Sequence, residues 1–330
     1  MDRVLEYKVT DSDPDRTLGG ILSKVLKQCM GLTPHEISHA KFTPKGLTVS
    51  RHIGQPGLYE SVTVKDRVAP GDIVRVLFRD NDADKERVEA VEGSVDILYE
   101  DEDVVVLNKP AGTVSHPSHG HHRDSLANYL AGYYKRSGKN GTLRVVGRLD
   151  KDTSGAILFA KNAPAASRLF RQKEQGIFRK TYLAVCANPP KEEIGTWNVI
   201  DAPLGPIPGT LMKQQIMEHP EGKSALTRYI CRGSFKNGSV IEAEIDTGRT
   251  HQIRVHLASV GHPLIGDKLY GEDIGSTYEA DRALLHAWKV TFRKPFGDET
   301  VNITVPVPDD MVELCQPDFD LKSPTSSVSI

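Results

Sequence analysis

Asp150 is the side chain in this sequence best placed to do covalent chemistry. It lies in residues 147–161, GRLDKDTSGAILFAK, after a Gly-Arg-Leu segment and before a Thr-Ser-Gly turn and an apolar strand. A carboxylate on a loop that a buried strand anchors, with Arg148 beside it, is arranged as a positioned nucleophile would be. An Asp that only hydrogen-bonds its own turn has the same local pattern, so these residues alone leave both interpretations open.

The segment RLDKDTSG resembles the RLD-x-x-TSG signature of RluA-type RNA pseudouridine synthases. Three further segments resemble motifs of this family in the same order along the chain: NKPAGTVSHPS at 108–118, RKTYLAV at 179–185 and GRTHQIRVHLASVGHPLIGDKLYG at 248–271. One short motif is weak evidence, whereas four motifs in order over about 160 residues are a strong signal. The resemblance covers roughly residues 95–305.

The resemblance implies isomerisation of uridine to pseudouridine in RNA. This reaction breaks the bond from ribose C1′ to N1 and joins C1′ to C5, and no atom enters or leaves. It therefore needs no metal or redox cofactor, and we expect none. It needs a group that engages the sugar or base covalently, as carboxylates do in glycosidases, and a pocket that holds the freed uracil. The base must first be flipped out of its stack.

The resemblance also assigns catalytic roles to three side chains. The family's catalytic Asp corresponds to Asp150, its active-site Tyr to Tyr182, and its Asp-pairing Arg to Arg254. Arg254 lies off the apolar stripe of its helix, so we expect it to reach Asp150 and keep that carboxylate ionised, although a surface Arg has the same pattern. Tyr182 is expected to stack on the target base, although a Tyr that packs within a sheet has the same sequence context.

The expected RNA contacts surround these residues. Arg148 would fill the stack that the flipped base leaves, unless it pairs with Asp150 or Asp152. Lys180 shares a strand face with Tyr182, where a cation and an aromatic ring suit a flipped base and its phosphate. The remaining candidates lie in the first and last motifs and are Asn108, Lys109, Arg249, Thr250, His251 and Gln252.

Two local features stand apart from the family pattern. RluA-type proteins usually have His before RLD, where this chain has Gly147, a departure that concerns RNA contact near the flipped nucleotide rather than catalysis. The segment HPSHGHH places four histidines at 116, 119, 121 and 122. Imidazole is a common zinc ligand, but a loop that contains Gly120 does not favour a rigid tetrahedral site. We therefore expect a loop that faces RNA, and no metal site.

The pattern of the elements, taken with the resemblance, predicts an α+β chain. Residues 95–307 are expected to form a pseudouridine synthase-type catalytic domain, with a mixed, mainly antiparallel sheet, flanking helices and a central cleft. Helices are predicted over 125–136, with Asp124 as N-cap, and from Asn162 to Gly176. The segments with strand composition are 104–108, 156–161, 181–186, 225–231 and 239–246.

Residues 1–80 resemble the small S-four-type RNA-binding domain, although the match is partial. Apolar spacing predicts a helix over 17–30, and a Thr33–Glu36 capping box starts a second helix that reaches about Lys41. LTVS then begins an extended stretch, and residues 61–78 indicate two strands joined by a Pro-Gly turn. A small α+β module without RNA contact is the alternative.

Composition sets the remaining expectations. The net charge is −2, and the acidic excess lies in 81–94, predicted as a linker or short solvated helix, and in 308–330, predicted as a disordered tail. Four scattered Cys indicate a reducing compartment. The acidic N-terminus has no apolar run of the kind a signal peptide needs. We therefore expect a cytoplasmic protein that is a monomer and has neither a membrane nor a nucleotide cofactor as partner.

The leading hypothesis is therefore an RNA uridine isomerase that acts on large-subunit ribosomal RNA or, as second choice, on tRNA. Two alternatives remain open. A glycosidic-bond hydrolase would use Asp150 and Asp152 as its carboxylate pair, and released uracil or sugar would reveal it. A pure RNA-binding or ribosome-assembly factor would keep its function after Asp150→Asn.

Overall fold

The computed structural model describes residues 1–11, 21–52, 57–79, 88–139, 141–210, 212–271, 280–316 and 318–321. The chain divides into two compact units. The first contains residues 1–87 with the short segments 139–142 and 161–164, and the second contains residues 88–138, 143–160 and 165–330.

The first unit is a small antiparallel sheet with helices. Its strand order is β1-β4-β2-β3, formed by β1 (Arg3–Lys8), β2 (Leu47–Ser50), β3 (Tyr59–Ser61) and β4 (Ile73–Phe78). Its helical segments are α1 (Leu22–Lys24), the π-helical turn η1 (Val25–Cys29) and α2 (Pro34–Phe42).

The sequence predicted part of this unit. The capping box is confirmed, since Glu36 N donates to Thr33 Oγ1 (3.2 Å) and Thr33 N donates to Glu36 Oε2 (2.7 Å). Of the helix predicted over 17–30, residues 17–20 lie outside the described residues, and α1 and η1 form in the remainder. Of the two strands predicted in 61–78, the second is confirmed as β4, whereas the first is wrong, because β3 already ends at Ser61. The Asp72 carboxylate instead accepts from Ala69 N (2.9 Å) and from His52 N (2.9 Å), which closes turns before β4.

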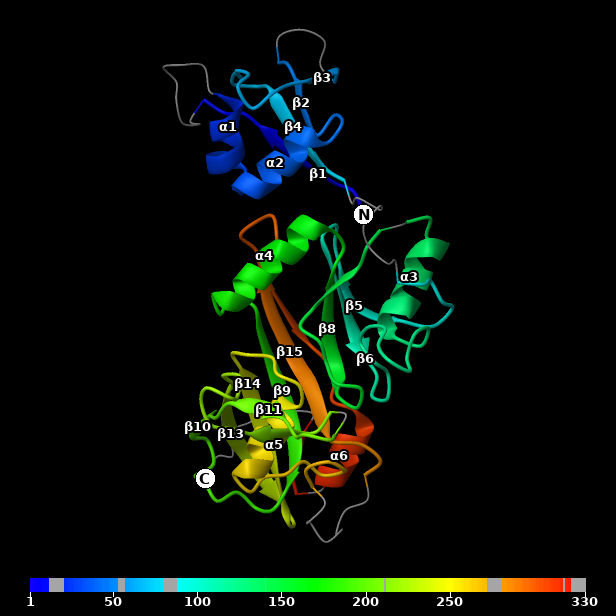
Figure 1. Ribbon diagram of the computed structural model, residues 1–330, viewed down its shortest axis with the longest axis vertical. Helices are drawn as coiled ribbons and strands as arrows, with labels where there is room; N and C mark the ends of the chain where they lie inside the picture. The colour runs from blue at the N-terminus through cyan, green and yellow to red at the C-terminus, as the bar shows by residue number, and fades with distance from the viewer. Residues whose placement is uncertain are drawn as a thin grey trace. The chain divides into compact units, whose positions relative to one another are not determined.

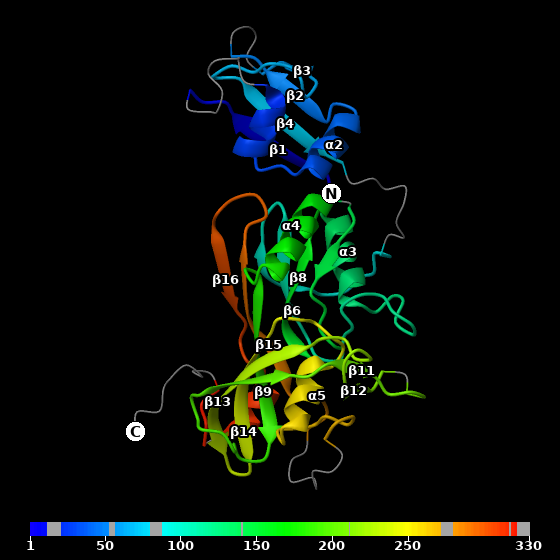
Figure 2. The same ribbon diagram turned by 60° about the vertical axis from the view of Figure 1, so that its left-hand side comes forward.

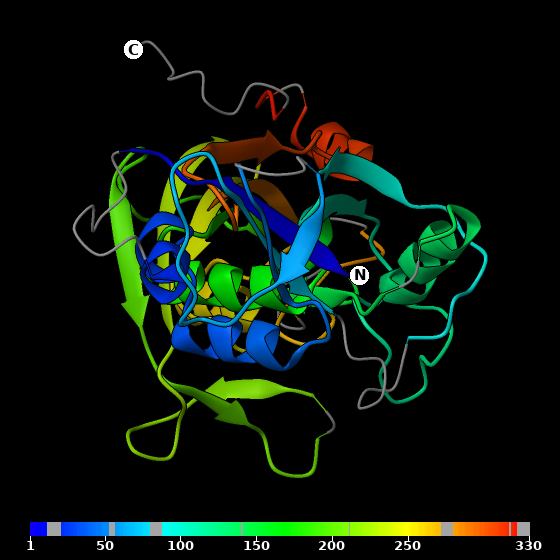
Figure 3. The same ribbon diagram turned by 90° about the horizontal axis from the view of Figure 1, so that it is seen from above.

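The second unit is built on a ten-stranded sheet among the described residues. Its main path runs β10-β13-β14-β9-β15-β8-β6-β5, with β16 beside β15 and β7 beside β8. The strands are β5 (Asp96–Glu100), β6 (Val104–Lys109), β7 (Arg144–Val146), β8 (Ser154–Ala160), β9 (Arg179–Ala187), β10 (Trp197–Asp201), β13 (Leu226–Phe235), β14 (Gly238–Ile245), β15 (Leu285–Arg293) and β16 (Thr300–Thr304). A separate hairpin, β11 (Leu204–Pro206) and β12 (Gln214–Ile216), projects from the body of this unit (Figure 3).

The pairing of β8 with β15 joins the two halves of this sheet. The strands run parallel there, with Ser154 opposite His286 and Gly155 opposite Ala287, whereas the other paired strands of the sheet are antiparallel. Figures 1 and 2 show β15 running between β8 and β9. The mixed, mainly antiparallel sheet is thus confirmed, and the loop that carries Asp150 enters β8 at the junction.

Each half of the sheet has its own core and its own helices. The first packs α4 (Ala163–Glu174) on β6 and β8 through Leu169, Val106 and Leu158. The second includes Leu183 of β9 and Val240 of β14. The helices α3 (Leu126–Arg136) and α5 (Gln252–Ser259) complete the unit, and no helix of the described residues is long and apolar enough to span a membrane.

Two details of the second unit differ from the sequence predictions. Ser125, not Asp124, is the N-cap of α3, because its hydroxyl accepts from Asn128 N. Residues 88–94 do not form a free linker, since Asn128 Nδ2 donates to Glu89 O (2.8 Å) and Val91 N donates to Asn128 O (3.1 Å).

The acidic C-terminal segment was also predicted wrongly in part. Residues Asp309–Cys315 form the helix α6, and Met311, Val312, Cys315 and Leu321 are buried in the second core. The apolar positions within the segment outweigh its acidic composition. Residues 317 and 322–330 of the expected tail lie outside the described residues.

Candidate active site

The loop that carries Asp150 is held by hydrogen bonds to its backbone on both sides. Leu149 N donates to Ser115 Oγ (3.1 Å), and that hydroxyl donates to Leu149 O (2.8 Å). Arg282 Nη1 donates to Asp152 O (3.2 Å). Thr153 N closes the turn on Asp150 O (3.2 Å), and Ser154 is already the first residue of β8. The Asp150 carboxylate is therefore presented from a fixed backbone.

Lys109 is part of this support rather than of the pocket. Its side chain is fully buried and its ammonium donates to Thr113 O (2.6 Å), Pro110 O (2.8 Å) and Lys151 O (2.9 Å). Burial lowers the pKa of Lys109 to about 7, although the charges of Asp150 and Asp152 act in the opposite direction. The expectation of an RNA contact is thus contradicted, because no face of this ammonium meets solvent.

Asn108 likewise does not line the site. It is the preceding residue of β6, and its Nδ2 donates to Asp96 Oδ2 of β5 (3.0 Å). The prediction that Asn108 contributes to the pocket is therefore corrected to a cross-strand role within the sheet.

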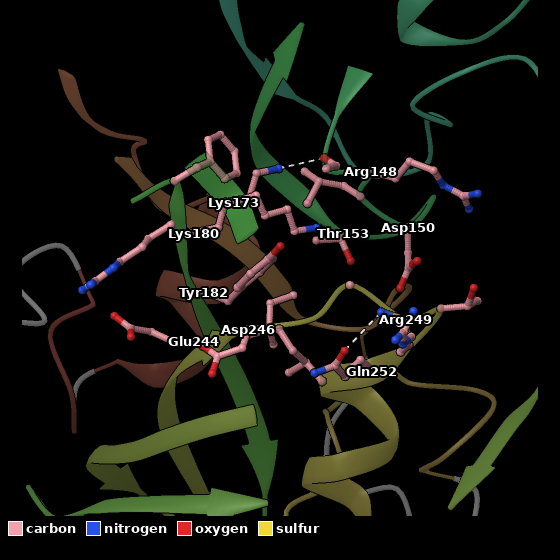
Figure 4. A pocket seen from close by; sticks show the side chains of 18 of the residues that line it. Arg148, Asp150, Thr153, Lys173, Lys180, Tyr182, Glu244, Asp246, Arg249 and Gln252 are labelled. Atoms are coloured by element: carbon pink, nitrogen blue, oxygen red, sulfur yellow. Dashed lines mark hydrogen bonds between the residues drawn. The ribbon is translucent and has the colours of Figure 1, made fainter. Parts of the chain in front are cut away.

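A pocket of about 1010 Å³ opens in front of Asp150 (Figure 4). This volume is near the upper end of the ~300–1,000 Å³ range of ligand pockets, so it exceeds what a single pyrimidine needs. Of the residues predicted from sequence, those that line it are Arg148, Asp150, Lys180, Tyr182, Arg249, Thr250, Gln252 and Arg254. The pocket brings these side chains together from β9, α5 and the loops before β8 and α5.

Tyr182 is buried on β9 and faces the pocket. Burial raises the pKa of its phenol, and the negative charge of Asp150 raises it further, so the phenol is protonated near neutral pH. A protonated phenol that feels the Asp150 charge can stack on a base and can donate a proton in the same site.

Arg254 is placed in the pocket, but its direct partner was not predicted. Its Nε and Nη2 donate to the two carboxylate oxygens of Asp267, at 2.7 and 2.6 Å, and both side chains are buried. Burial alone lowers the pKa of Arg254, but the hydrogen bonds and charge of Asp267, together with the charge of Asp150, outweigh it. The direct partner of Arg254 is therefore Asp267, and Asp150 is near enough for its charge to act on Arg254.

Lys180 lies on the same face of β9 as Tyr182, as expected, but it is buried. Its ammonium donates to Gly147 O (2.9 Å), at the start of the segment that leads to Asp150. Burial lowers the pKa of Lys180 to about 7, and the charge of Lys173 adds to this. Lys180 thus holds the start of the Asp150 segment, and its contact with an RNA phosphate stays a prediction.

Not all residues of the motif RTHQ line the pocket. Arg249 and Thr250 line the pocket, whereas His251 is buried with its Nδ1 3.0 Å from Tyr270 Oη. Gln252 reaches the pocket but is 3% exposed, and its Oε1 accepts from Arg249 N (3.1 Å). His251 is thus absent from the pocket lining, whereas Gln252 lines the pocket and also holds the backbone that presents Arg249, and the RNA contacts of both stay predictions.

The histidine cluster forms no metal-binding group within the described parts of the chain. His121 Nδ1 lies 2.6 Å from Asp124 Oδ2, and its Nε2 lies 3.5 Å from Lys151 Nζ. His121 is thus tied to an acid and to the residue that follows Asp150.

Several pocket residues were not found from the sequence. Lys173 comes from the last turn of α4, and Arg228 and Asp246 come from β13 and the end of β14, where they form two hydrogen bonds of 2.7 and 2.6 Å. Asp267, the partner of Arg254, lies in the quoted motif GDKLYG, so the motif contained the only sequence signal among these four.

Comparisons with known proteins agree with this geometry. Residues 103–259 match a family model described as RNA pseudouridylate synthase. The RNA pseudouridine synthase YhcT of Bacillus subtilis (strain 168) is 34% identical over 319 residues, which are 96% of this chain and 98% of that protein. Ribosomal large subunit pseudouridine synthase D of Nitrosomonas europaea is 34% identical over 276 residues, 82% of this chain and 77% of that protein.

A solved structure has the same fold over most of its length. Human RNA pseudouridylate synthase domain containing 1 is 26% identical, with a TM-score of 0.51, and the match covers 68% of this chain and 86% of that one.

Proposed function

The chain belongs to the RNA pseudouridylate synthase family, and from this premise we propose that Asp150 is the nucleophile that engages the ribose or the base. The protein is an isomerase that converts uridine to pseudouridine in RNA. The observation that carries the proposal is the position of Asp150: Ser115 and Arg282 hold the backbone on either side of it, at Leu149 and Asp152, while Asp150 borders a pocket larger than one nucleobase.

The neighbouring side chains supply the other roles. Tyr182 stacks on the flipped base and its protonated phenol can exchange a proton with it. Asp267 holds the Arg254 guanidinium in place, where its positive charge interacts with the negative charge of Asp150. Arg148, exposed at the pocket rim, fills the space that the base leaves in the RNA.

We propose large-subunit ribosomal RNA as the substrate, with tRNA as the second choice. The name of the Nitrosomonas europaea relative supports the first, and an RNA-binding role for residues 1–80 would fit a large structured RNA. A monomer in the cytoplasm is consistent with four cysteines that are all free thiols, three of them buried. Carbodiimide mapping of pseudouridine in RNA from cells with and without this gene identifies the RNA and the uridine.

The catalytic assignment is tested with Asp150→Asn on the RNA that mapping identifies. We expect turnover to fall by several orders of magnitude while RNA affinity stays within about tenfold, because the change removes the nucleophile but not the pocket. Asp152→Asn is the matched control, since the Asp152 side chain does not line the pocket.

The control also separates the alternative functions. A hydrolase with a carboxylate pair would lose activity in both variants and would release uracil from the wild-type reaction. Full activity of Asp150→Asn on purified RNA would refute the assignment. If Asp150→Asn also replaced the wild-type gene in cells without loss, the protein would act as an RNA-binding factor.

A further inference from the structure

Three cationic side chains converge in the pocket from three separate elements. Lys173 comes from the last turn of α4, Lys180 from β9, and Arg249 from the loop between β14 and α5. Figure 4 shows all three bordering the same space as Asp150 and Tyr182. Of the three, only Lys180 and Arg249 were expected near RNA from the sequence. The Lys180 ammonium donates a hydrogen bond to Gly147 O.

Lys173 lies directly against the segment that carries Arg249. A Cβ atom placed on Gly248 would be 3.1 Å from Lys173 Nζ, so this glycine leaves the space that the ammonium occupies. Burial lowers the pKa of Lys173, and the charge of Arg249 lowers it further. The charge of Lys173 in turn lowers the pKa of Lys180. These like charges therefore repel one another where they stand.

No carboxylate relieves this repulsion among the described residues. Arg249 uses its Nε to donate to Ser224 O (2.9 Å), which fixes the guanidinium but leaves its charge uncompensated. The acids that line the pocket are Asp150, Glu174, Glu244 and Asp246. Asp246 pairs with Arg228, and within the described parts of the chain none of the four makes an ion pair with Lys173 or Arg249. Close cations that the fold holds together without a counterion favour an anionic ligand.

We propose that Lys173 and Arg249 form a binding site for a backbone phosphate of the RNA, on the wall of the pocket that faces Asp150. The inference rests on the proposed function and deepens it, because a nucleotide that enters this pocket carries one phosphodiester on each side of its ribose. The volume of about 1010 Å³ leaves room for that phosphate beside the base. The site holds the strand while the base turns.

The test measures the salt dependence of RNA binding. Binding to the mapped RNA, in an Asp150→Asn background that prevents turnover, is compared for Lys173, Lys173→Gln and Lys173→Arg at several salt concentrations. Each phosphate contact contributes about 0.7–0.9 to the slope of log K against log [salt]. We expect Lys173→Gln to lower the slope by about that amount and Lys173→Arg to keep the wild-type slope.

Arg171→Gln is the matched control. Arg171 is exposed in the same last turn of α4 and does not line the pocket. Like Lys173→Gln, Arg171→Gln removes one positive charge and its interaction with the helix dipole, but it removes no charge from the pocket. We expect Arg171→Gln to leave the slope unchanged. Equal slopes for Lys173→Gln and the wild type, or equal losses in Lys173→Gln and Arg171→Gln, would overturn the phosphate site.

The outcome is distinguishable from failure of the proposed function. In the active background, Lys173→Gln is expected to raise KM by more than it lowers kcat, because the phosphate contact is made before the chemical step. If the wild-type protein forms no pseudouridine in the mapped RNA but the slopes still differ as expected, the proposed function fails and the phosphate site stands. If pseudouridine forms and the slopes do not differ, only the phosphate site fails.

Discussion

Arg282 donates two hydrogen bonds to the carboxylate of Asp310, at 2.6 and 2.9 Å, and with its third nitrogen it donates to the carbonyl of Asp152. Asp310 belongs to α6, and Asp152 lies two residues after the proposed nucleophile. The acidic C-terminal helix therefore orients an arginine that holds the catalytic loop. Nη1 of Arg282 also donates to Leu285 O (3.3 Å), which ties the same contact to the first residue of β15.

The first prediction concerns this contact. Arg282→Met is expected to lower kcat at least tenfold while RNA affinity is nearly kept, because misplacement of a reacting group by about 1 Å can cost ~100-fold in rate. Lys294→Met is the control, since it removes an exposed cation paired with Glu299 at 2.6 Å on the far end of β15. Single-turnover rates measure the effect. Equal rates in the two variants would show that the Asp150 loop is held without Arg282.

The second prediction concerns the buried pair Arg254–Asp267. Asp267→Asn is expected to reduce the free energy of unfolding by about 3–5 kcal/mol, because it leaves the Arg254 charge buried and without its carboxylate. The matched control is Asp246→Asn, which breaks the solvent-exposed pair with Arg228 and should cost about 0–1 kcal/mol. Urea unfolding monitored by circular dichroism measures both. A loss in Asp267→Asn no larger than in the control would mean that water reaches Arg254.

The third prediction concerns two glycines near Asp150. Gly155 has φ +104, and a Cβ there would lie 2.3 Å from Ala287 O, on the parallel neighbour β15. Gly147 has φ +77, but a Cβ there would meet Lys180 Nζ only at 3.6 Å. Gly147→Ala should therefore cost about 1–2 kcal/mol of backbone strain, whereas Gly155→Ala must also push the two strands apart and should fold poorly. Comparison of thermal unfolding and expression of the two variants checks this order.

The glycines also show what the sequence could and could not predict. TSG was interpreted as a turn before the strand, but Ser154 and Gly155 are the first residues of β8. The glycine is needed by the approach of β15, which lies about 130 residues further along the chain (Ser154 pairs with His286). Local patterns predicted β6, β8, β9, β13 and β14 of the large sheet, but they missed β5, β7, β10, β15 and β16. They could not predict which strands become neighbours.

The same contrast between local patterns and contacts between distant segments holds for the site. Short motifs located Asp150, Tyr182 and Arg254, because those side chains reach the pocket from the segments that the motifs describe. They could not show that Lys109 is fully buried, since burial of a polar side chain depends on what packs over it. Lys173 was missed because the last turn of α4 meets the pocket only in three dimensions.

The fourth prediction is a pH dependence of stability that arises from Lys180. Its pKa is 10.5 in a model peptide and about 7 in the folded protein, chiefly because of burial. Between these values the unfolded chain binds more protons than the folded one, so the free energy of unfolding rises with pH from about 7 to about 10 and is flat below that range. Lys109, with a pKa also lowered to about 7, adds to the same rise.

Lys180→Met tests this origin, because methionine fills a similar volume and does not titrate. We expect the rise in unfolding free energy between pH 7 and pH 10 to become smaller in the variant, and the variant to gain most relative to the wild type near pH 7, where burial of a charged ammonium destabilises the wild type. Lys109→Met should reduce the rise further in the double variant. Guanidinium unfolding at several pH values measures the three slopes. A slope in Lys180→Met equal to that of the wild type would mean that the Lys180 ammonium is hydrated in the folded state. The hydrogen bond from Lys180 to Gly147 O would then not be what orients the Asp150 segment.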